Sequence, residues 1–247
     1  MSKTVNRVAV IMAGGQGTRL KPITLYINKH FFPVYDKPMI YYSINLVIKA
    51  GIKKALIICN REDKVLYKKI FRHLHKKIKI FYIVQNNPHG IAQGLMIAKH
   101  FIKKSNVMFL LGDNFLYGKN LKSILSKANK LKSNCILTHY VKNPKQYGVL
   151  QKKSNFYKII EKPKKYIGNN AVIGIYFYQN EALKELKNLK KSKRDEYEVT
   201  DFNNRILNNN AKIITVPKSY YWKDLGTFDD LYDAGQFLKK NKIKTYV

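Results

Sequence analysis

A glycine-rich turn ends the first apolar run of the chain. Residues 7–12 read RVAVIM, and the sequence continues as AGGQGTRL to Leu20. Glycines allow a backbone to approach a ligand closely and expose N–H groups, which bind phosphate oxygens. Arg19, directly behind the glycines, adds a cation that pairs with the same kind of oxygen. The combination predicts a site for the phosphates of a nucleotide.

Two common nucleotide-binding motifs do not match this turn. The Walker A loop needs a G-x-x-x-x-G-K-[ST] pattern, which the residues from Gly14 to Leu20 do not provide. The dinucleotide fingerprint G-x-G-x-x-G begins at Gly15, but Leu20 stands at its third glycine. No acidic residue follows at the end of a second strand to bind a ribose. A dehydrogenase is therefore disfavoured. A plain tight turn is disfavoured as well, since Thr18 and Arg19 follow three glycines.

Strands alternate with helices through the first half of the sequence. The apolar patterns predict strands at 7–12, 54–59, 78–85 and 106–113, and helices at 37–52, 62–74 and 90–102. This alternation is typical of a parallel sheet with right-handed crossovers, in which ligands bind beyond the carboxyl ends of the strands. We therefore expect the glycine-rich turn, Gln85 and Asp113 to lie at one edge of the sheet.

The second half of the sequence is less regular. It predicts strands at 135–141, 147–152, 156–162, 171–178 and 211–216, helices at 181–189 and 199–207, and a last helix that ends near Lys240. No repeat and no Pro/Gly/Ser-rich linker divides the chain. We expect an α/β fold with a Rossmann-like, mostly parallel central sheet flanked by helices. Residues 1–247 would form one domain, with a nucleotide-binding half to about residue 115 and a second half, about 116–247, that caps the active edge.

The charge of the chain is strongly positive but evenly spread. The 47 lysines and arginines exceed the 15 acidic residues, so the net charge is +32. Lysines occur in nearly every segment, together with many Asn, Ile and Tyr residues, which indicates drift in an AT-rich genome more than a nucleic-acid-binding face. Arginines, which bind phosphates and bases best, occur only at Arg7, Arg19, Arg61, Arg72, Arg194 and Arg205. Nucleic acid is therefore a disfavoured partner, although a basic exterior attracts anionic substrates.

The absence of targeting signals and the cysteine pattern predict a cytoplasmic protein. No apolar run approaches the roughly 20 residues of a membrane helix, and the N-terminal segment does not resemble a signal peptide. Cys59 and Cys135 stand far apart and match no zinc or redox motif. Unpaired cysteines are typical of a reducing compartment.

The motifs of this chain resemble, in order, those of the sugar-nucleotide pyrophosphorylases, and within them the glucose-1-phosphate thymidylyltransferases. The resemblance starts with MAGGQGTRLKPIT at 12–24 and NKHFFPVYDKPMIYYSINLVIKAGI at 28–52. It continues with QNNPHGIAQG, LGDNFLYG, QYGVL, EKP, AVIGIYFY, RDEYEVTD and WKDLGTFDDL, and spans residues 7 to about 238. It implies a nucleotidyltransferase (GT-A-like) architecture in which the second half binds the sugar.

The resemblance also implies an activity. A nucleotidyl group would pass from dTTP to glucose 1-phosphate, with dTDP-glucose and pyrophosphate as products. The same scaffold using UTP, CTP or another sugar 1-phosphate remains open, because one methyl group changes binding by only ~1–3 kcal/mol. A relative without catalytic activity, which binds nucleotide or RNA through its basic surface, is the alternative from a different class.

Residues at the matching positions receive roles from the resemblance. The catalytic set would be Arg19, Lys29, Asp113 and Lys162. The nucleotide-binding set would be Gly14, Gly15, Gly17, Thr18, Arg19, Lys29, His30, Gln85, Gly90 and Asp113, with Gln85 and Gly90 at the base. The sugar-phosphate-binding set would be Gly148, Glu161, Lys162, Val172 and Arg194. Asp113 and Asp224 would hold a Mg²⁺ cofactor, since carboxylate oxygens suit this ion.

Two departures from the family pattern carry expectations of their own. His30 stands where the family has Gln, and we favour a tolerated replacement over altered triphosphate affinity or a pH-sensitive step. The sequence is a short form that ends soon after the last matching helix, without the extension that helps to form a second, regulatory nucleotide site in the family. We therefore expect feedback at such a site to be lost, and one nucleotide product to bind per subunit. The family usually forms homo-oligomers, and we expect one here.

Overall fold

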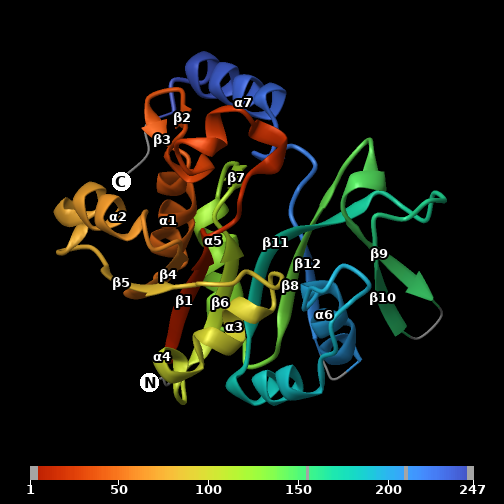
Figure 1. The fold of residues 1–247 in the computed structure, drawn as a ribbon. Helices are drawn as coiled ribbons and strands as arrows, with labels where there is room; N and C mark the ends of the chain where they lie inside the picture. Colours follow the sequence, from red (N-terminus) through yellow and green to blue (C-terminus); the bar gives the residue numbers. More distant parts are fainter. Residues whose placement is uncertain (1–4, 154–155, 209–210, 244–247) are drawn as a thin grey trace.

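The computed structural model describes residues 5–153, 156–208 and 211–243, and its centre is a mixed sheet (Figure 1). Seven of its strands are ordered β10-β9-β11-β6-β1-β4-β5, and β8 pairs with β11 and with β12. The bounds of these strands are β1 Arg7–Met12, β4 Lys54–Cys59, β5 Lys79–Val84, β6 Asn106–Leu111, β8 Cys135–Tyr140, β9 Gly148–Lys153, β10 Phe156–Glu161, β11 Asn170–Tyr178 and β12 Lys212–Thr215.

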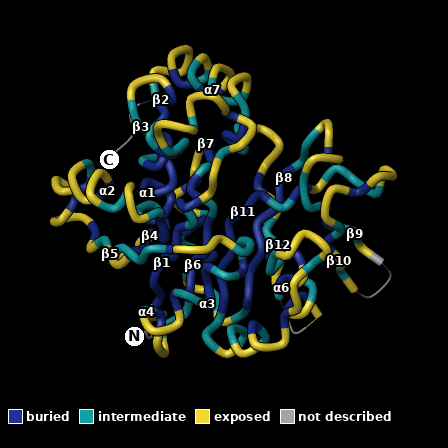
Figure 2. The backbone as a smooth tube through the Cα atoms, in the orientation of Figure 1, coloured by how far each residue is buried: buried dark blue, intermediate teal, exposed yellow. Residues whose placement is uncertain are grey.

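The four strands of the first half are parallel, as predicted. β1 pairs with β4 and β6, and β4 pairs with β5. Nearly every residue of β1, β4 and β6 is buried, as expected for strands covered on both faces (Figure 2). The carboxyl ends are aligned, since Met12 lies opposite both Ile58 and Leu111. The segments that follow these strands therefore share one edge of the sheet.

Helices cover the two faces of this sheet. On one face, α1 (Ile40–Lys49), α2 (Lys64–Ile70) and α5 (Leu121–Asn129) contribute side chains to the same apolar cluster. On the other face, α3 (Gln93–Ile97), α4 (Lys99–Ile102) and α6 (Val199–Leu207) contribute to a second cluster. The helix predicted at 37–52 begins only at Ile40, because Lys37–Pro38 forms strand β3, which pairs with β2 (Pro33–Val34). The helix predicted at 90–102 is divided into α3 and α4.

The predicted strands of the second half extend the same sheet, with antiparallel pairs except for β12, which runs parallel to β8. β11 lies against β6 with Ile175 opposite Leu110, and it also pairs with β8 and β9. The β9–β10 hairpin projects from this side of the molecule, with α6 packed beside β10 (Figure 1). The sheet is therefore continuous between the two halves, and the second half adds a wall beside the parallel strands.

The segment predicted as a helix at 181–189 is a 3₁₀ helix, η6 (Asn180–Asn188). Its apolar anchors Leu183, Leu186 and Leu189 are spaced three residues apart, and they pack on the second cluster. Three residues per turn is the repeat of a 3₁₀ helix, so this spacing keeps Leu183 and Leu186 on one side, and Leu189 follows directly after the last turn.

A small additional sheet was not predicted and joins the middle of the chain to its end. β7 (Asn114–Tyr117) pairs with β13 (Tyr221–Asp224), so that Asp224 lies opposite Asn114. The last helix, α7 (Phe228–Lys240), follows β13 and packs on β2. The pairing of β7 with β13 brings two distant acidic residues, Asp113 and Asp224, to the same edge of the main sheet. In the described ranges, no helix is long and apolar enough to span a bilayer.

Candidate active site

The glycine-rich turn follows β1 and leaves part of its backbone open. Gly17 has a left-handed φ of 60°, and a Cβ there would lie 2.9 Å from Cγ2 of Thr24. The Thr24 hydroxyl donates a hydrogen bond of 2.9 Å to the Gly17 carbonyl, which holds the turn in this conformation. By contrast, a Cβ at Gly15 would meet no described atom within 4 Å. Gly15, Thr18 and Arg19 are exposed, so an anion can approach their backbone.

Lys29 and Asp113 form an ion pair beneath this turn. Lys29 opens the 3₁₀ turn η3 (Lys29–Phe31), its methylene groups lie beside Gly17, and its ammonium contacts the carboxylate of Asp113 just beyond β6. Burial by itself would raise the pKa of Asp113, but the Lys29 ammonium lowers it below the usual range. In return, Asp113 raises the pKa of Lys29 against the effect of burial. Both groups are therefore charged at neutral pH.

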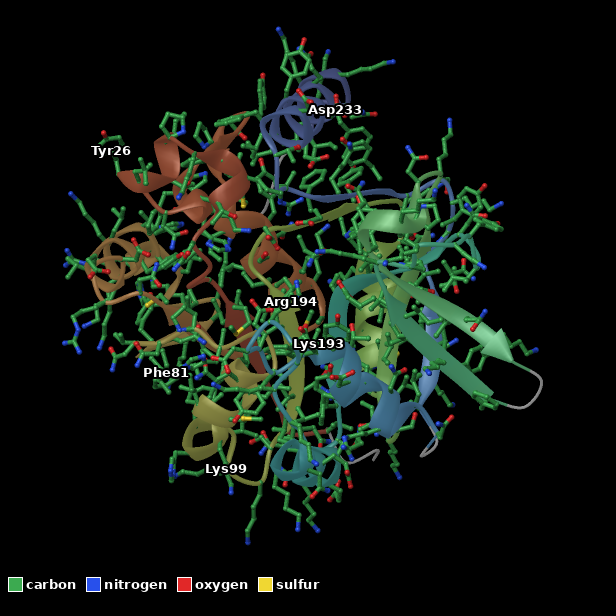
Figure 3. All side chains as sticks on the ribbon, turned by 45° about the vertical axis from the view of Figure 1, so that its right-hand side comes forward. Tyr26, Phe81, Lys99, Lys193, Arg194 and Asp233 are labelled. Carbon is green, nitrogen blue, oxygen red and sulfur yellow. The ribbon has the colours of Figure 1, made fainter. Side chains whose placement is uncertain are left out.

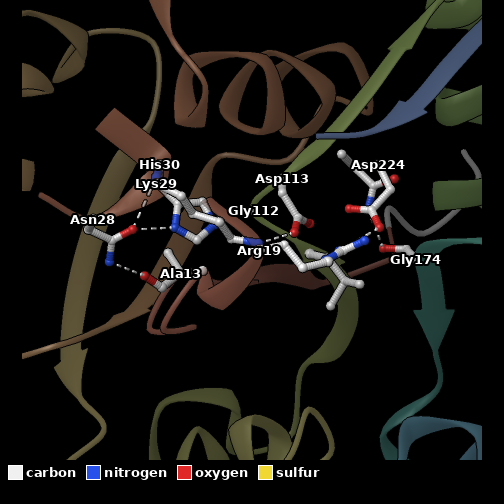
Figure 4. Close-up of polar contacts among 12 residues, drawn as sticks. Ala13, Arg19, Asn28, Lys29, His30, Gly112, Asp113, Gly174 and Asp224 are labelled. Atoms are coloured by element: carbon white, nitrogen blue, oxygen red, sulfur yellow. Dashed lines mark hydrogen bonds and ion pairs between the residues drawn. The ribbon is translucent and has the colours of Figure 1, made fainter. Parts of the chain in front are cut away.

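A second ion pair joins the glycine-rich turn to β13. Arg19 lies 3.5 Å from the carboxylate of Asp224, measured from Nη2 to Oδ2 (Figure 4). Gly226 leaves room for this contact, because a Cβ there would collide with the Arg19 guanidinium. Burial and then the Asp113 carboxylate raise the pKa of Asp224. The two acidic groups are thus near enough to repel each other.

The donor chemistry of this acidic pair fits a divalent cation. Asp113 and Asp224 present hard oxygen ligands from adjacent elements, and a cation between them would relieve their repulsion. Within the described part of the chain, no group of three or more His, Cys, Asp and Glu side chains is placed to hold a metal. Two carboxylates are a donor set that suits Mg²⁺, which is commonly held by one or two carboxylates with substrate phosphates and water.

His30 is enclosed on the far side of Lys29. Its Nδ1 lies 2.8 Å from Oδ1 of Asn28, and a Cβ at Gly112 would lie 2.6 Å from its Nε2. Burial, and next the Lys29 ammonium, lower the pKa of His30 to about 3. The imidazole is therefore neutral at physiological pH.

A cavity of about 550 Å³ opens beside Arg19 and Asp224, between the second-half strands and α6. Six of the predicted site residues line it, namely Arg19, Gly148, Glu161, Lys162, Val172 and Asp224. The structure thus brings the phosphate-side cation Arg19 and four of the five predicted sugar-phosphate-binding residues to one space. Lining residues that the sequence did not single out for a role include Asn114, Tyr147, Gly174, Thr200 and Asn203.

Polar side chains in this cavity are held in place by neighbours. The Thr200 hydroxyl donates to Oε2 of Glu161 at 2.9 Å, and a Cβ at Gly148 would lie 3.1 Å from the same oxygen. The indole of Trp222 donates to Oδ1 of Asn114 at 2.8 Å. Lys162 has a left-handed φ of 42°, which is uncommon outside glycine and clusters at functional sites. Thr200 and Asn114 lie in the EVTD and LGDN stretches, so their place in those motifs was the available signal.

Arg194 does not line this cavity. It lies on a neighbouring hollow of about 640 Å³, which shares Glu161, Lys162 and Thr200 with the cavity. Its guanidinium donates to both oxygens of Glu198, at 2.9 and 3.0 Å. Figure 3 shows Arg194 beside Lys193 in front of the sheet. In this arrangement the residue is an exposed neighbour of the predicted sugar site.

Gln85 flanks the other side of the glycine-rich turn, and Gly90 lies further along the segment that follows β5. Gln85 is buried just beyond β5, and a Cβ at Gly14 would lie 3.3 Å from its Oε1. Gly90 has a φ of 92° and packs against the backbone of Tyr197, where a Cβ would come within 2.7 Å of two backbone atoms. Gln93, which the sequence analysis did not single out, accepts hydrogen bonds from the Gln85 amide and from the backbone of His89. The expected meeting of the turn, Gln85 and Asp113 at one edge is confirmed.

The relatives found by sequence comparison agree with one another in their family and their assigned activity. Residues 8–241 match the sequence profile of the nucleotidyl transferase family. The glucose-1-phosphate thymidylyltransferase of Neisseria meningitidis is 38% identical over 235 residues, which are 93% of this chain and 82% of the relative. The glucose-1-phosphate thymidylyltransferase of Mycobacterium tuberculosis is 38% identical over 234 residues, 93% of this chain and 81% of the relative.

Solved structures share the fold over nearly the whole chain. A Bacillus anthracis protein assigned as a glucose-1-phosphate thymidylyltransferase, solved with sucrose, has a TM-score of 0.82 at 31% identity, with 94% of each chain covered. A UDP-glucose pyrophosphorylase solved with UDP-glucose has a TM-score of 0.83 at 23% identity, covers 96% of this chain and 100% of its own, and shows the shared fold. With the profile spanning residues 8–241 and relatives at 38% identity, the chain belongs to the nucleotidyl transferase family.

Proposed function

We propose that this protein is a glucose-1-phosphate thymidylyltransferase, which joins dTTP and glucose 1-phosphate into dTDP-glucose and releases pyrophosphate. Its relatives of that name are 38% identical over 93% of the chain. The observation that carries the proposal is the meeting of Arg19 and Asp224 with Glu161 and Lys162 around one cavity. A triphosphate on the glycine-rich turn would thus lie next to a sugar phosphate.

The reaction is a substitution at phosphorus. An oxygen of the sugar 1-phosphate attacks the α-phosphorus of the triphosphate, a new phosphorus–oxygen bond forms, and the bond to the β-phosphate breaks. Such a transfer requires mainly alignment of the two substrates and stabilisation of negative charge. The protein therefore has to supply positive charge and fixed hydrogen-bond donors on both sides of one phosphorus atom.

The glycine-rich turn and two cations serve the triphosphate side. The backbone amides at Gly14, Gly15 and Gly17 would bind phosphate oxygens, and Thr18 would add a hydroxyl. Arg19 and Lys29 would stabilise charge on the α-phosphate and on the leaving pyrophosphate. The exposure of Gly15, Thr18 and Arg19 fits this role, and so does the position of the Lys29 stem beside Gly17.

The second half serves the sugar phosphate. Glu161, held by the Thr200 hydroxyl, would accept hydrogen bonds from sugar hydroxyls on the floor of the cavity. Lys162 follows it with an unusual backbone conformation and would bind the attacking phosphate. Gly148 and Val172 would leave room for the sugar ring, and Arg194 would add charge from the adjoining hollow.

A Mg²⁺ cofactor is part of the proposal. Asp113 and Asp224 would hold it, and when bound it would neutralise phosphate charge and polarise the phosphorus–oxygen bonds. Burial and the Asp113 carboxylate raise the pKa of Asp224, and this repulsion between two carboxylates, which a cation would relieve, supports the assignment. We further propose a homo-oligomer that works in the cytoplasm, where the buried free thiols of Cys59 and Cys135 would remain reduced.

A matrix of nucleoside triphosphates against sugar 1-phosphates, with detection of pyrophosphate, tests the proposal. We expect the highest kcat/KM for dTTP with glucose 1-phosphate, and loss of turnover in Asp113→Ala. Asp224→Asn is measured beside it to separate loss of function from loss of folding. The Asp224 side chain is more exposed than that of Asp113, so this substitution disturbs packing less. A higher kcat/KM with another pair would reassign the substrate. Salt-dependent RNA binding without any turnover would favour the alternative of a relative without catalytic activity.

A further inference from the structure

Hydrogen bonds with Gln93 fix which end of the Gln85 side-chain amide faces the glycine-rich turn. Gln85 Nε2 donates to Oε1 of Gln93 at 2.5 Å, and the same Oε1 accepts the backbone N–H of His89 at 2.8 Å. A backbone N–H is always a donor, so Gln93 must turn its oxygen toward His89. The group of Gln85 that faces this oxygen must then be a donor too, which is its NH₂ group.

The carbonyl oxygen of Gln85 therefore points the other way. It faces Gly14 in the glycine-rich turn, at 3.3 Å from the position of a Cβ on that residue. Within the described ranges, no donor forms a hydrogen bond with this oxygen, and it is not one of the side-chain atoms that are closed to solvent without a partner, so a ligand can reach it. A ligand that covers this oxygen displaces its water, and because an acceptor left without a partner is costly, the ligand should bring a donor.

Pyrimidine bases differ in what they offer to such an acceptor. Thymine and uracil carry an N–H at ring position 3, whereas cytosine has a lone pair there. An acceptor facing a lone pair is repulsive, and the mismatch leaves two buried polar groups without partners. A Gln85 amide free to rotate would accommodate either base by turning over, since an amide has a donor at one end and an acceptor at the other.

From this arrangement, which rests on the proposed nucleotide site, we propose that Gln93 is the residue that sets base specificity. By holding the Gln85 amide in one orientation, Gln93 makes the site select bases with an N–H at position 3, thymine and uracil, and reject cytosine. It is a positioning residue, because it acts through Gln85 rather than on the base. The contact between Gln93 and Gln85 does not distinguish thymine from uracil, because it does not involve the methyl group.

Binding of dUTP and dCTP provides the test, since their bases differ only at positions 3 and 4 of the ring. Affinities are measured calorimetrically with Mg²⁺ and without sugar phosphate, so the result does not depend on turnover. We expect the wild-type protein to prefer dUTP by about 100-fold or more, as a site built around one hydrogen bond does. In Gln93→Leu we expect the preference to fall to about 10-fold or less, through tighter dCTP binding, because the Gln85 amide is released.

Gln93→Glu is the matched control. Its carboxylate accepts from both Gln85 and His89 as the amide oxygen does, so the preference should stay within about threefold of the wild type even if both affinities fall together. Equal wild-type binding of dUTP and dCTP would overturn the proposal, and so would an unchanged preference in folded Gln93→Leu. Nucleotide binding with this preference but without transfer would instead contradict the proposed function, and failure of both nucleotides to bind would contradict the site itself.

Discussion

Lys29 and Asp113 form an ion pair that is almost closed to solvent, with 12% and 14% of their side chains exposed. Lys29 is the first residue of η3, and Asp113 follows the end of β6. The pair therefore also connects the phosphate side of the site to the sheet. An ion pair at this depth is sensitive to the loss of either partner, because the remaining charge loses its direct partner; for Lys29 only the Asp224 carboxylate then stays near.

Asp113→Asn should therefore destabilise the fold as well as remove activity. We expect the free energy of unfolding to fall by about 3–5 kcal/mol, as measured in urea at neutral pH. The double variant Lys29→Met, Asp113→Leu should recover much of this loss, since no buried charge remains. Equal stability of Asp113→Asn and the wild type would show that the pair is not effectively buried.

Removal of divalent cations should stop pyrophosphate release. We expect EDTA to abolish turnover and added Mg²⁺ to restore it. Asp224→Asn should require about 10-fold more Mg²⁺ or more for half-maximal rate, because changing even a residue that only supports a metal ligand costs about 10–100-fold in metal affinity. Asp229→Asn, an exposed change on α7 in the same motif, should leave the Mg²⁺ requirement unchanged. Full activity in EDTA would remove Mg²⁺ from the proposal.

Two glycines of the phosphate turn should respond differently to alanine. Gly15→Ala meets no described atom within 4 Å, so its melting temperature should match the wild type while the KM for dTTP rises. Gly17→Ala places a Cβ near Thr24 at a left-handed φ, so it should lower stability by about 1 kcal/mol or more. Thermal melts and kinetics with dTTP distinguish the two effects. An unaltered KM in Gly15→Ala would indicate that phosphates bind elsewhere.

His30 should make the protein sensitive to acid. Its pKa is about 3 in the folded chain and about 6.5 when unfolded, so below pH 6.5 only the unfolded chain takes up the proton. This favours unfolding as the pH falls, and the stability is regained as the pH rises. Relative to the wild type, His30→Gln should therefore gain about 2 kcal/mol between pH 7 and pH 5, by urea unfolding. A constant difference across this range would show that His30 is protonated in the folded state.

The order of motifs and the alternation of strands and helices determined much of this protein in advance. The sequence predicts β1 and the parallel strands beside it, because strands buried on both faces form continuous apolar runs. That regularity also placed Gln85 and Asp113 at the edge that carries the turn. Element ends were less readable, as with the start of α1, because the pairing of β2 with β3 depends on contacts outside the local pattern.

Only the tertiary structure decided which side chains meet. Asp224 reaches Arg19 and Asp113 because β13 pairs with β7, and a local sequence pattern does not specify the partner of so short a strand. Arg194 shares its segment with residues that face the cavity, yet its guanidinium lies on Glu198 outside it. Gln93 has no role predicted from the sequence, and only the fold places its oxygen between Gln85 and His89. Hydrogen-bond direction and charge repulsion depend on distances of a few ångströms, and the chain sets these only when it is folded.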